Sequence, residues 1–317
     1  MAWPLIKLLP QTTRFTFVKF ARHMGVLSTV LIIASLVGVF YPGLNLGIDF
    51  KGGSVMEVST APKAIDLGKV REILGSQGLG DVQVQAFGSS DRALVRFQTP
   101  VGADAAGTMT KVQTELRQGL GEPVRFLNPS VVGPKVSGEL FTSGLVALAL
   151  AIGLMFLYIW FRFEPQFGLG AVAGLLHDLI LTFGMIVLFK IEFSLNTVAA
   201  LLTVIGYSMN DTVVVFDRLR ENLRKYKKMP LDDLIDLTIN ETLSRTIITG
   251  VTAVMALTGL AVFGGEALLG FSIVMIFGII VGTYSSIYVG APIILLWGVK
   301  RGDEEATPVK LGAASRP

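Results

Sequence analysis

Six long apolar runs dominate the pattern of hydrophobic and polar positions along the chain. A membrane-spanning helix needs about 20 mainly apolar residues, because each residue advances the helix by about 1.5 Å through a hydrocarbon core about 30 Å thick. The runs that meet this requirement are 24–42, 140–161, 167–189, 195–216, 245–263 and 267–298. The pattern predicts a polytopic α-helical membrane protein with six transmembrane helices, the last long enough to tilt or to continue past the membrane.

A stretch of mixed polarity, residues 43–139, separates the first run from the second. Its apolar positions alternate or recur at helical spacing in the order strand, helix, strand, strand, helix, strand. The expected elements are 54–59, 64–77, 81–87, 92–98, 103–120 and 124–132, with a turn at 88–91. This order matches a ferredoxin-like α+β domain inserted between spans one and two.

A charged segment, residues 217–244, connects the fourth run to the fifth. Residues 217–222 are expected to continue the fourth helix into solvent, where Asp217 and Arg220 have a favourable spacing for an ion pair. Residues 231–243 mix apolar and acidic positions as a short amphipathic helix at a membrane surface does. A simple connector is an equally good interpretation of that stretch.

Composition agrees with a membrane protein, since 51% of the residues are hydrophobic and 16% are charged, against about 25% charged in soluble domains. The chain has no cysteine, which excludes thiol and disulfide chemistry, and its two histidines, His23 and His177, are far apart. We expect no metal, no cofactor and no enzymatic activity. The net charge of +3 can indicate nucleic acid, but these basic residues flank apolar runs, so we expect no nucleic-acid partner.

The positions of lysine and arginine predict the orientation, because basic residues favour the cytoplasmic side of a membrane. They gather before the first run and after the second, fourth and sixth runs, whereas the opposite loops hold Lys190 and Glu266. The N-terminal segment 1–23 and the tail 299–317 are therefore expected in the cytoplasm, and 43–139 on the other side. The first run lacks a small-residue cleavage site, so we expect an uncleaved span.

The most informative polar residues lie in the fourth run. Helical spacing places Tyr207, Asn210 and Asp211 on one stripe that should face other helices. An ionised aspartate at this depth costs roughly 2.5–3.5 kcal/mol, and each factor of ten in a protonation equilibrium corresponds to about 1.4 kcal/mol. Asp211 could therefore bind and release a proton near neutral pH. The alternative is a structural carboxylate that pairs with another helix or reaches the headgroups.

Arg245 opens the fifth run on the same side of the membrane as Asp211. An ion pair between the two would favour the ionised carboxylate, so a motion that forms and breaks the pair would be a proton switch. Arg245 could equally be an anchor of the kind that the positive-inside rule describes.

Two other pairs stand out in the apolar runs. His177 and Asp178, in the middle of the third run, could belong to a proton relay or could form an interhelical hydrogen bond. Gly278 and Gly282 have the G-x-x-x-G spacing that permits close helix packing.

Several of these motifs are similar to those of the SecD/SecF family, which is related to the resistance-nodulation-division transporters. Residues 47–53, GIDFKGG, resemble the family signature after the first span, and residues 206–222, GYSMNDTVVVFDRLREN, resemble the fourth-span motif of its SecF branch. The signature positions are Gly47, Asp49, Gly52 and Gly53. Residues 243–247 and the His177-Asp178 pair also fit, and the resemblance extends over about residues 14–300.

The resemblance implies a subunit of the protein translocase in the bacterial inner membrane, with 43–139 in the periplasm. Such a subunit would pair with SecD, which has a similar six-span core, and would associate with the SecYEG channel and the translocating polypeptide. Together they would use the proton-motive force to promote late steps of export, with Asp211 as the proton-coupling carboxylate and Arg245 as its partner. One proton crossing about 100 mV supplies about 2.3 kcal/mol, enough to bias a domain movement.

Two other hypotheses remain open at this point. A structural subunit would stabilise the translocase complex without proton transport and would not depend on Asp211. One half of a small-molecule proton antiporter would need a solute pocket within 43–139, and no residue in that stretch points to one.

Overall fold

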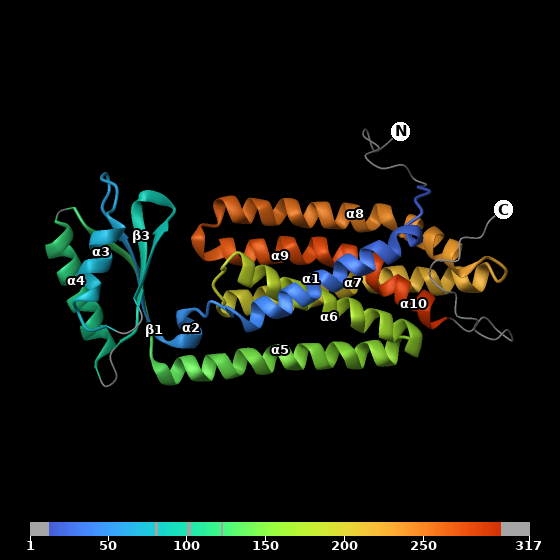
Figure 1. Ribbon diagram of the computed structural model, residues 1–317, viewed down its shortest axis with the longest axis horizontal. Coiled ribbons are helices and arrows are strands. Elements are labelled where there is room, and N and C mark those ends of the chain that lie inside the picture. Colours follow the sequence, from blue (N-terminus) through green and yellow to red (C-terminus); the bar gives the residue numbers. More distant parts are fainter. Residues whose placement is uncertain (1–12, 80–81, 100–102, 122, 299–317) are drawn as a thin grey trace, which may run out of the picture. The chain divides into compact units, whose positions relative to one another are not determined.

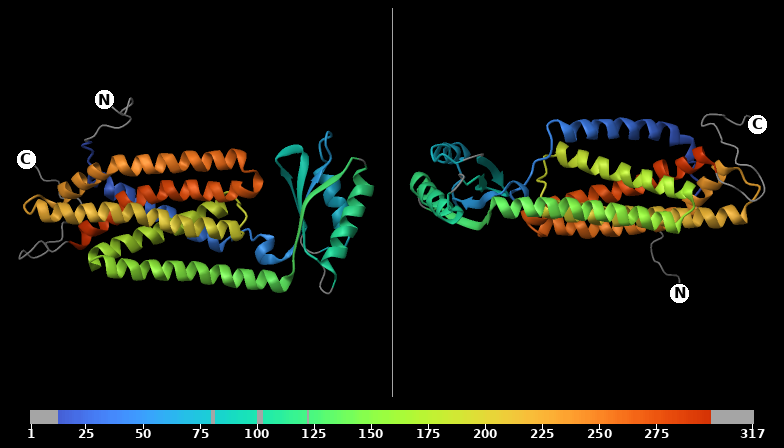
Figure 2. Two further views of the ribbon diagram at one scale, coloured as in Figure 1. Left: turned by 180° about the vertical axis from the view of Figure 1, so that it is seen from behind. Right: turned by 90° about the horizontal axis from the view of Figure 1, so that it is seen from below.

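The computed structural model of the chain describes residues 13–79, 82–99, 103–121 and 123–298 (Figure 1, Figure 2). Segments 1–12 and 299–317, parts of the expected cytoplasmic ends, lie outside the described residues. The chain divides into two compact units. The sheet unit comprises Asn45–Ala147 and Glu192–Leu195, and the remaining residues form the helical unit.

Six helices are long and apolar enough to cross a membrane, as the hydrophobic pattern predicts. After a 3₁₀ turn, η1 (Val18–Phe20), they are α1 (Ala21–Phe40), α5 (Pro134–Arg162), α6 (Pro165–Leu188), α7 (Leu195–Lys225), α8 (Leu231–Phe263) and α9 (Glu266–Ser285) continued by α10 (Ala291–Trp297). A π-helical turn, η2 (Ser286–Gly290), joins α9 to α10. Pro292 follows this turn and has no N–H for the carbonyl four residues back, which favours an irregular turn there.

Helix α7 continues through residues 217–222, as the sequence indicates, but Asp217 has a different partner from the predicted one. Its carboxylate accepts hydrogen bonds of 2.6 Å from the Arg162 guanidinium at the end of α5. Arg220 instead lies 3.8 Å from Glu164. Sequence spacing along one helix cannot reveal such partners, because they come from a different helix.

Helix α8 runs without a break from Leu231 to Phe263, so residues 231–243 are the first part of the fifth long helix and not a separate amphipathic helix. Their apolar side chains Leu234, Ile235 and Ile239 are buried. Polar contacts also hold this part against α7, where Asn222 donates a 3.0 Å hydrogen bond to Thr238. Packing on α7 keeps these residues inside the helical unit.

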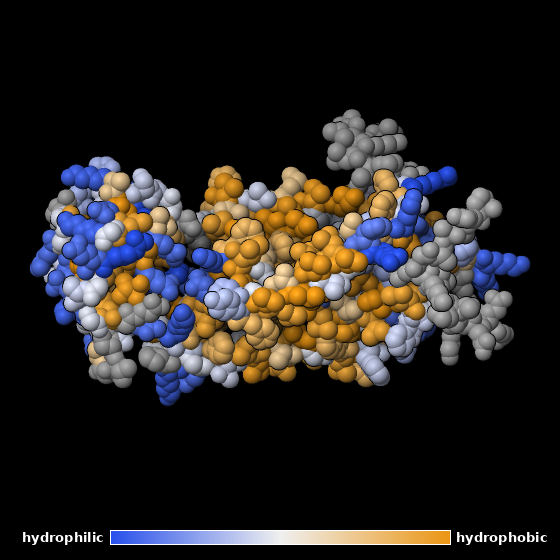
Figure 3. All heavy atoms as spheres, viewed as in Figure 1, coloured by the Kyte–Doolittle hydropathy of each residue, from blue (hydrophilic) through white to orange (hydrophobic). Residues whose placement is uncertain are grey.

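Helices α6 and α7 form the interior of the helical unit. In the most apolar window of α6, 61% of the residues are buried, compared with 6% in α1 and 11% in α8. The peripheral helices therefore present apolar side chains outward, as a lipid or partner surface requires. Figure 3 shows this apolar surface over the helices of the unit, with hydrophilic side chains at the end where α1 begins and where α7 turns into α8.

The sheet unit contains a four-stranded antiparallel sheet with the order β2-β3-β1-β4. Its strands are β1 (Gly53–Ser59), β2 (Val82–Phe87), β3 (Ser89–Phe97) and β4 (Arg125–Val132), and a short helix, α2 (Ile48–Lys51), precedes them. Helices α3 (Leu67–Gly75) and α4 (Ala105–Leu120) cover one face of the sheet (Figure 1). Between these layers lies an apolar core that includes Met56, Val58, Leu74, Val95, Phe97 and Leu116.

The β2–β3 turn is tighter than the predicted 88–91. Gly88, with a φ of 67°, separates the two strands, and residues 89–91 already belong to β3. The Asp91 carboxylate accepts hydrogen bonds from the Ser89 and Ser59 hydroxyls, which lower the pKa of Asp91. The polar run that resembles a loop is therefore an exposed strand end with its own hydrogen bonds.

Helix α9 approaches α7 closely at the two glycines of the G-x-x-x-G spacing. A Cβ atom at Gly278 would overlap the side chain of Val204, and one at Gly282 would lie 3.1 Å from Ser208 Cβ. Because glycine has no side chain, α7 and α9 can touch at both positions.

We expect Gly278→Val to lower the stability of the helical unit by about 1–3 kcal/mol, because the added methyl groups overpack a buried contact. Thermal unfolding of the detergent-solubilised protein measures this loss. Gly259→Val in α8 is the matched control, since a Cβ atom there has no neighbour within 4 Å. Equal losses in the two variants would contradict close packing at Gly278.

Candidate functional site

Buried polar side chains connect α1, α6, α7 and α9 in the interior of the helical unit. Asp178 is the central one and is completely buried. Its Oδ1 accepts a 2.9 Å hydrogen bond from His177 Nδ1, and its Oδ2 accepts bonds of 2.5 Å from Ser208 and 2.7 Å from Ser285. A buried carboxylate is tolerated when such donors replace water, so Asp178 holds α6 against both α7 and α9.

His177 extends this network to α1. Its Nε2 lies 3.2 Å from the Ser28 hydroxyl, which lies 2.8 Å from the hydroxyl of Tyr284. That phenol also donates to the carbonyl of Met24 at 2.9 Å. The imidazole and the Tyr284 ring stack with their centroids 5.8 Å apart, which fixes the orientation of the histidine.

The hydrogens that these side chains carry can be compared with the number of contacts in the network. The four contacts from Asp178 to the Met24 carbonyl need four hydrogens. With Asp178 ionised, neutral His177, Ser28 and Tyr284 supply three, whereas a doubly protonated imidazole supplies the fourth. Which of these contacts carries a hydrogen therefore depends on the tautomer of the imidazole.

Asp211 lies one turn of α7 beyond Ser208 and is 4% exposed. Its Oδ2 accepts a 3.4 Å hydrogen bond from Thr283 on α9. The neighbouring Thr212 hydroxyl lies 3.0 Å from that of Ser286. Asp211 and Asp178 are thus both solvated by hydroxyls from one short stretch of α9.

Arg245 is exposed on α8 and forms no ion pair with Asp211 within the described part of the chain. The Tyr207 hydroxyl is buried near Thr249 but does not reach hydrogen-bonding geometry. Asn210 is exposed in the single chain, so it does not face the other helices of this chain as Ser208 and Asp211 do.

The hydroxyl groups that complete the site were not predicted from the sequence. They are Ser28, Ser208, Thr283, Tyr284, Ser285 and Ser286. An isolated serine in an apolar run carries little information, because its hydroxyl can bond to its own helix. A usable signal was the unbroken run of hydroxyl residues at 283–286, which is exceptional inside an apolar span.

The signature residues 47–53 lie in the sheet unit, where they contact residues 192–195. The Gly47 N–H donates to the Phe193 carbonyl at 2.9 Å, and a Cβ atom at Gly47 would lie 2.5 Å from a carboxylate oxygen of Glu192. Asp49 accepts a 2.9 Å hydrogen bond from the N–H of Leu195, the first residue of α7. An aspartate at this place satisfies a free helix N–H and complements the positive end of the helix dipole.

Glu192 also forms an ion pair with Arg96 of β3. Burial raises the pKa of the Glu192 carboxyl, and the neighbouring guanidinium opposes part of this effect. A glycine at position 47 leaves the space that this partly buried pair requires.

Gly52 and Gly53 turn the chain from α2 into β1. Their φ angles are 69° and 123°, values that residues with a side chain rarely adopt. A Cβ atom at Gly53 would also lie 2.8 Å from the carbonyl oxygen of Phe97 on the neighbouring strand. The positive φ angles at both positions and the close strand at Gly53 thus explain why two glycines stand here in the sheet unit.

Two protein-family models match the chain. The model described as protein export membrane protein SecD/SecF, C-terminal, matches residues 112–300. The model of the SecD/SecF GG motif matches residues 40–64, which include the double glycine.

Curated relatives match almost the whole chain. Protein translocase subunit SecF of Cereibacter sphaeroides is 46% identical over 308 residues, which cover 94% of each chain. The protein of the same name from Rickettsia bellii is 41% identical over 296 residues, which cover 93% of this chain and 97% of the relative.

Solved structures of SecDF also resemble the chain. The crystal structure of SecDF from Thermus thermophilus, described as a translocon-associated membrane protein, has a TM-score of 0.81 at 32% identity over 92% of this chain. SecDF in a super-membrane-facing form has a TM-score of 0.68 at 31% identity over 93% of this chain. The present chain spans 39% and 40% of the lengths of those two chains.

We expect Gly53→Ala to destabilise the sheet by about 3 kcal/mol, because the methyl group adds contact with a backbone oxygen to an unfavourable φ. Hydrogen exchange of the β1 and β3 amides measures this loss. Gly78→Ala is the control, since Gly78 also has a positive φ, of 64°, but open space around its Cβ position, so about 1 kcal/mol is expected. Similar exchange in the two variants would contradict the role of the Phe97 contact.

We expect Asp178→Ala to destabilise the helical unit by about 3 kcal/mol, because three hydrogen-bond donors lose a buried acceptor. The measurement is thermal unfolding in detergent. Asp217→Ala removes a half-exposed carboxylate from an ion pair and should cost less than about 1 kcal/mol. If the Asp178→Ala protein were as stable as the Asp217→Ala control, the central role of Asp178 would be contradicted.

Proposed function

We propose a function that follows from the family: the chain belongs to the family of SecD/SecF protein export membrane proteins, and we infer that it is a SecF-type subunit of the bacterial Sec translocase. The SecF relatives that it matches along almost their full length support this assignment. Six apolar helices agree with a multi-pass protein of the inner membrane. The longer SecDF chains, of which it matches one part, support SecD as its partner.

We assign the sheet unit to the periplasm as a ferredoxin-like domain. The strand order β2-β3-β1-β4, with two helices on one face, supports this fold. Basic residues at the α7–α8 connection support a cytoplasmic location for that end and for both termini. The chain would then contact SecYEG and the translocating polypeptide as a non-enzymatic subunit.

The observation that carries the mechanism is the pair of buried carboxylates, Asp178 and Asp211, which accept hydrogen bonds from two neighbouring hydroxyls of α9, Ser285 and Thr283 respectively. We propose that Asp211 binds a proton from the periplasmic side and releases it to the cytoplasm. Ionised Asp211 would attract Arg245, whereas protonated Asp211 would rely on Thr283, so each proton would change how α8 packs on α7. Asp178 and His177 form the adjoining proton-holding network.

This cycle converts the proton-motive force into movement. A proton crossing about 100 mV supplies about 2.3 kcal/mol, which can shift an equilibrium between two helix arrangements about fifty-fold. Transmission of that shift to the periplasmic domain would promote the late steps of polypeptide export.

We expect Asp211→Asn to abolish the stimulation of export by the proton-motive force while assembly with SecD persists, because asparagine keeps the shape but cannot cycle a proton. Export into inverted membrane vesicles that contain the SecD complex, with and without an uncoupler, measures the stimulation. Co-purification with SecD reports assembly.

Asp232→Asn in α8 is the matched control, since it removes the same charge from an exposed position and should keep the stimulation. Normal stimulation with Asp211→Asn would remove the proton mechanism. It would instead favour a structural subunit that stabilises the complex without proton transport.

A further inference from the structure

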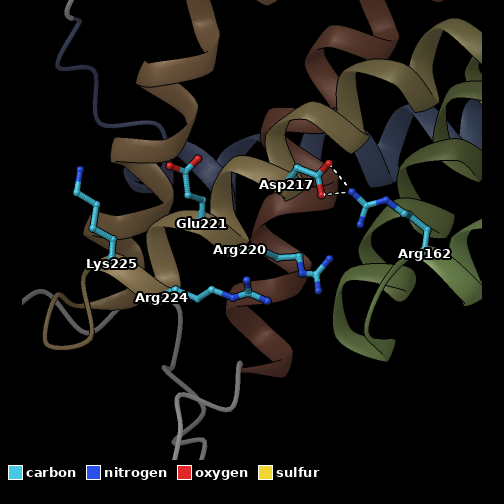
Figure 4. A pocket seen from close by; sticks show the side chains of 6 residues that line it. All are labelled: Arg162, Asp217, Arg220, Glu221, Arg224 and Lys225. Carbon is cyan, nitrogen blue, oxygen red and sulfur yellow. Dashed lines mark hydrogen bonds and ion pairs between the residues drawn. The ribbon is translucent and has the colours of Figure 1, made fainter.

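A charged cleft of about 450 Å³ lies in the helical unit where α5 ends and α7 approaches its last turns. It is lined by Arg162, Asp217, Arg220, Glu221, Arg224 and Lys225. Figure 4 shows Arg162 directed toward Asp217, with Arg220 and Arg224 extending into the space below them.

The acidic side chains of the cleft are neutralised by neighbours. Arg162 bonds to both oxygens of Asp217 at 2.6 Å. Glu221 accepts a 2.6 Å bond from Arg218, which lies outside the cleft lining. Both carboxylates of the cleft therefore have arginine partners, although Arg218 is shared between Glu221 and Glu241.

Arg224 and Lys225 are exposed, and neither forms an ion pair or a hydrogen bond with any residue that the structure describes. The Lys225 ammonium lies 5.0 Å from the centre of the Tyr226 ring. The cleft consequently carries two positive charges outside any ion pair among the described residues, beside Arg220, whose ion-pair contact with Glu164 is 3.8 Å long.

The end of α5 indicates the depth of this cleft in the membrane. Tyr158, Trp160 and Phe161, directly before Arg162, are 47%, 77% and 79% exposed. Exposed aromatic residues at the end of a membrane-spanning helix gather at the level of the lipid headgroups. The cleft begins at that level, where phospholipid phosphates are the most concentrated anions.

We propose that this cleft binds the headgroup phosphate of an anionic phospholipid. Arg224 and Lys225 supply the charge, and the planar guanidinium of Arg220 is suited to bind phosphate oxygens. The acyl chains of the lipid would lie against the exposed apolar side chains of α5. This site is independent of proton coupling, so its existence does not depend on the proposed function.

Nanodiscs made from equal parts of phosphatidylcholine and phosphatidylglycerol provide the test. Native mass spectrometry of the released full-length protein counts the lipids of each kind that it retains. We expect the wild-type protein to prefer phosphatidylglycerol. In the double variant Arg224→Gln/Lys225→Gln, the preference for phosphatidylglycerol should fall about fivefold for each charge removed, because each basic side chain near an anionic surface contributes about 1 kcal/mol.

The matched control is Lys227→Gln/Lys228→Gln, which removes the same charge from exposed residues of the same connection but outside the cleft lining. Retention of the preference in this control and its loss in the cleft variant would support the site. An equal loss of the preference in both variants, or no loss in either, would overturn the proposal. These basic residues would then only set the orientation of the protein in the membrane. Displacement of phosphatidylglycerol from the wild-type protein by inorganic phosphate would also overturn it, in favour of a soluble anion.

Discussion

The helical unit depends on how one buried carboxylate is solvated. Asp178 has no access to water, and its charge is tolerable because three donors from α6, α7 and α9 surround it. Each donor fixes the rotation of its helix, since a turn of about 100° per residue would remove the hydroxyl from reach. The same rotation sets Asp211 against Thr283 and brings the two glycines of α9 against α7. Solvation of Asp178 and the geometry around Asp211 are thus one constraint.

The sequence predicted those features that a local pattern records. Six apolar runs correspond to six long helices, and the alternation within 43–139 corresponds to four strands and two covering helices. Asp211 and the His177-Asp178 pair stood out because charge inside a span is expensive. Prediction failed where the deciding partner is distant in the chain: Asp217 pairs with α5 and not along its own helix.

The same limitation explains the hydroxyl groups. Ser28 matters because His177, 149 positions later in the chain, lies beside it. No periodicity within the sequence of α1 could predict that contact. Asn210 illustrates the converse, because a polar residue next to Asp211 is turned outward by the packing of Ser208. Polarity within an apolar run marks a helix as functional, but the three-dimensional structure is needed to choose among its faces.

Helix α7 begins at Leu195, where Asp49 of the signature holds its first N–H, and ends at Lys225 beside the charged cleft. Its 31 residues make a cylinder about 46 Å long, and no proline interrupts it. Without a proline, each backbone N–H beyond the first turn can bond within the helix. A tilt or rotation of α7 at Asp211 therefore acts on the same continuous helix whose last turns line the charged cleft.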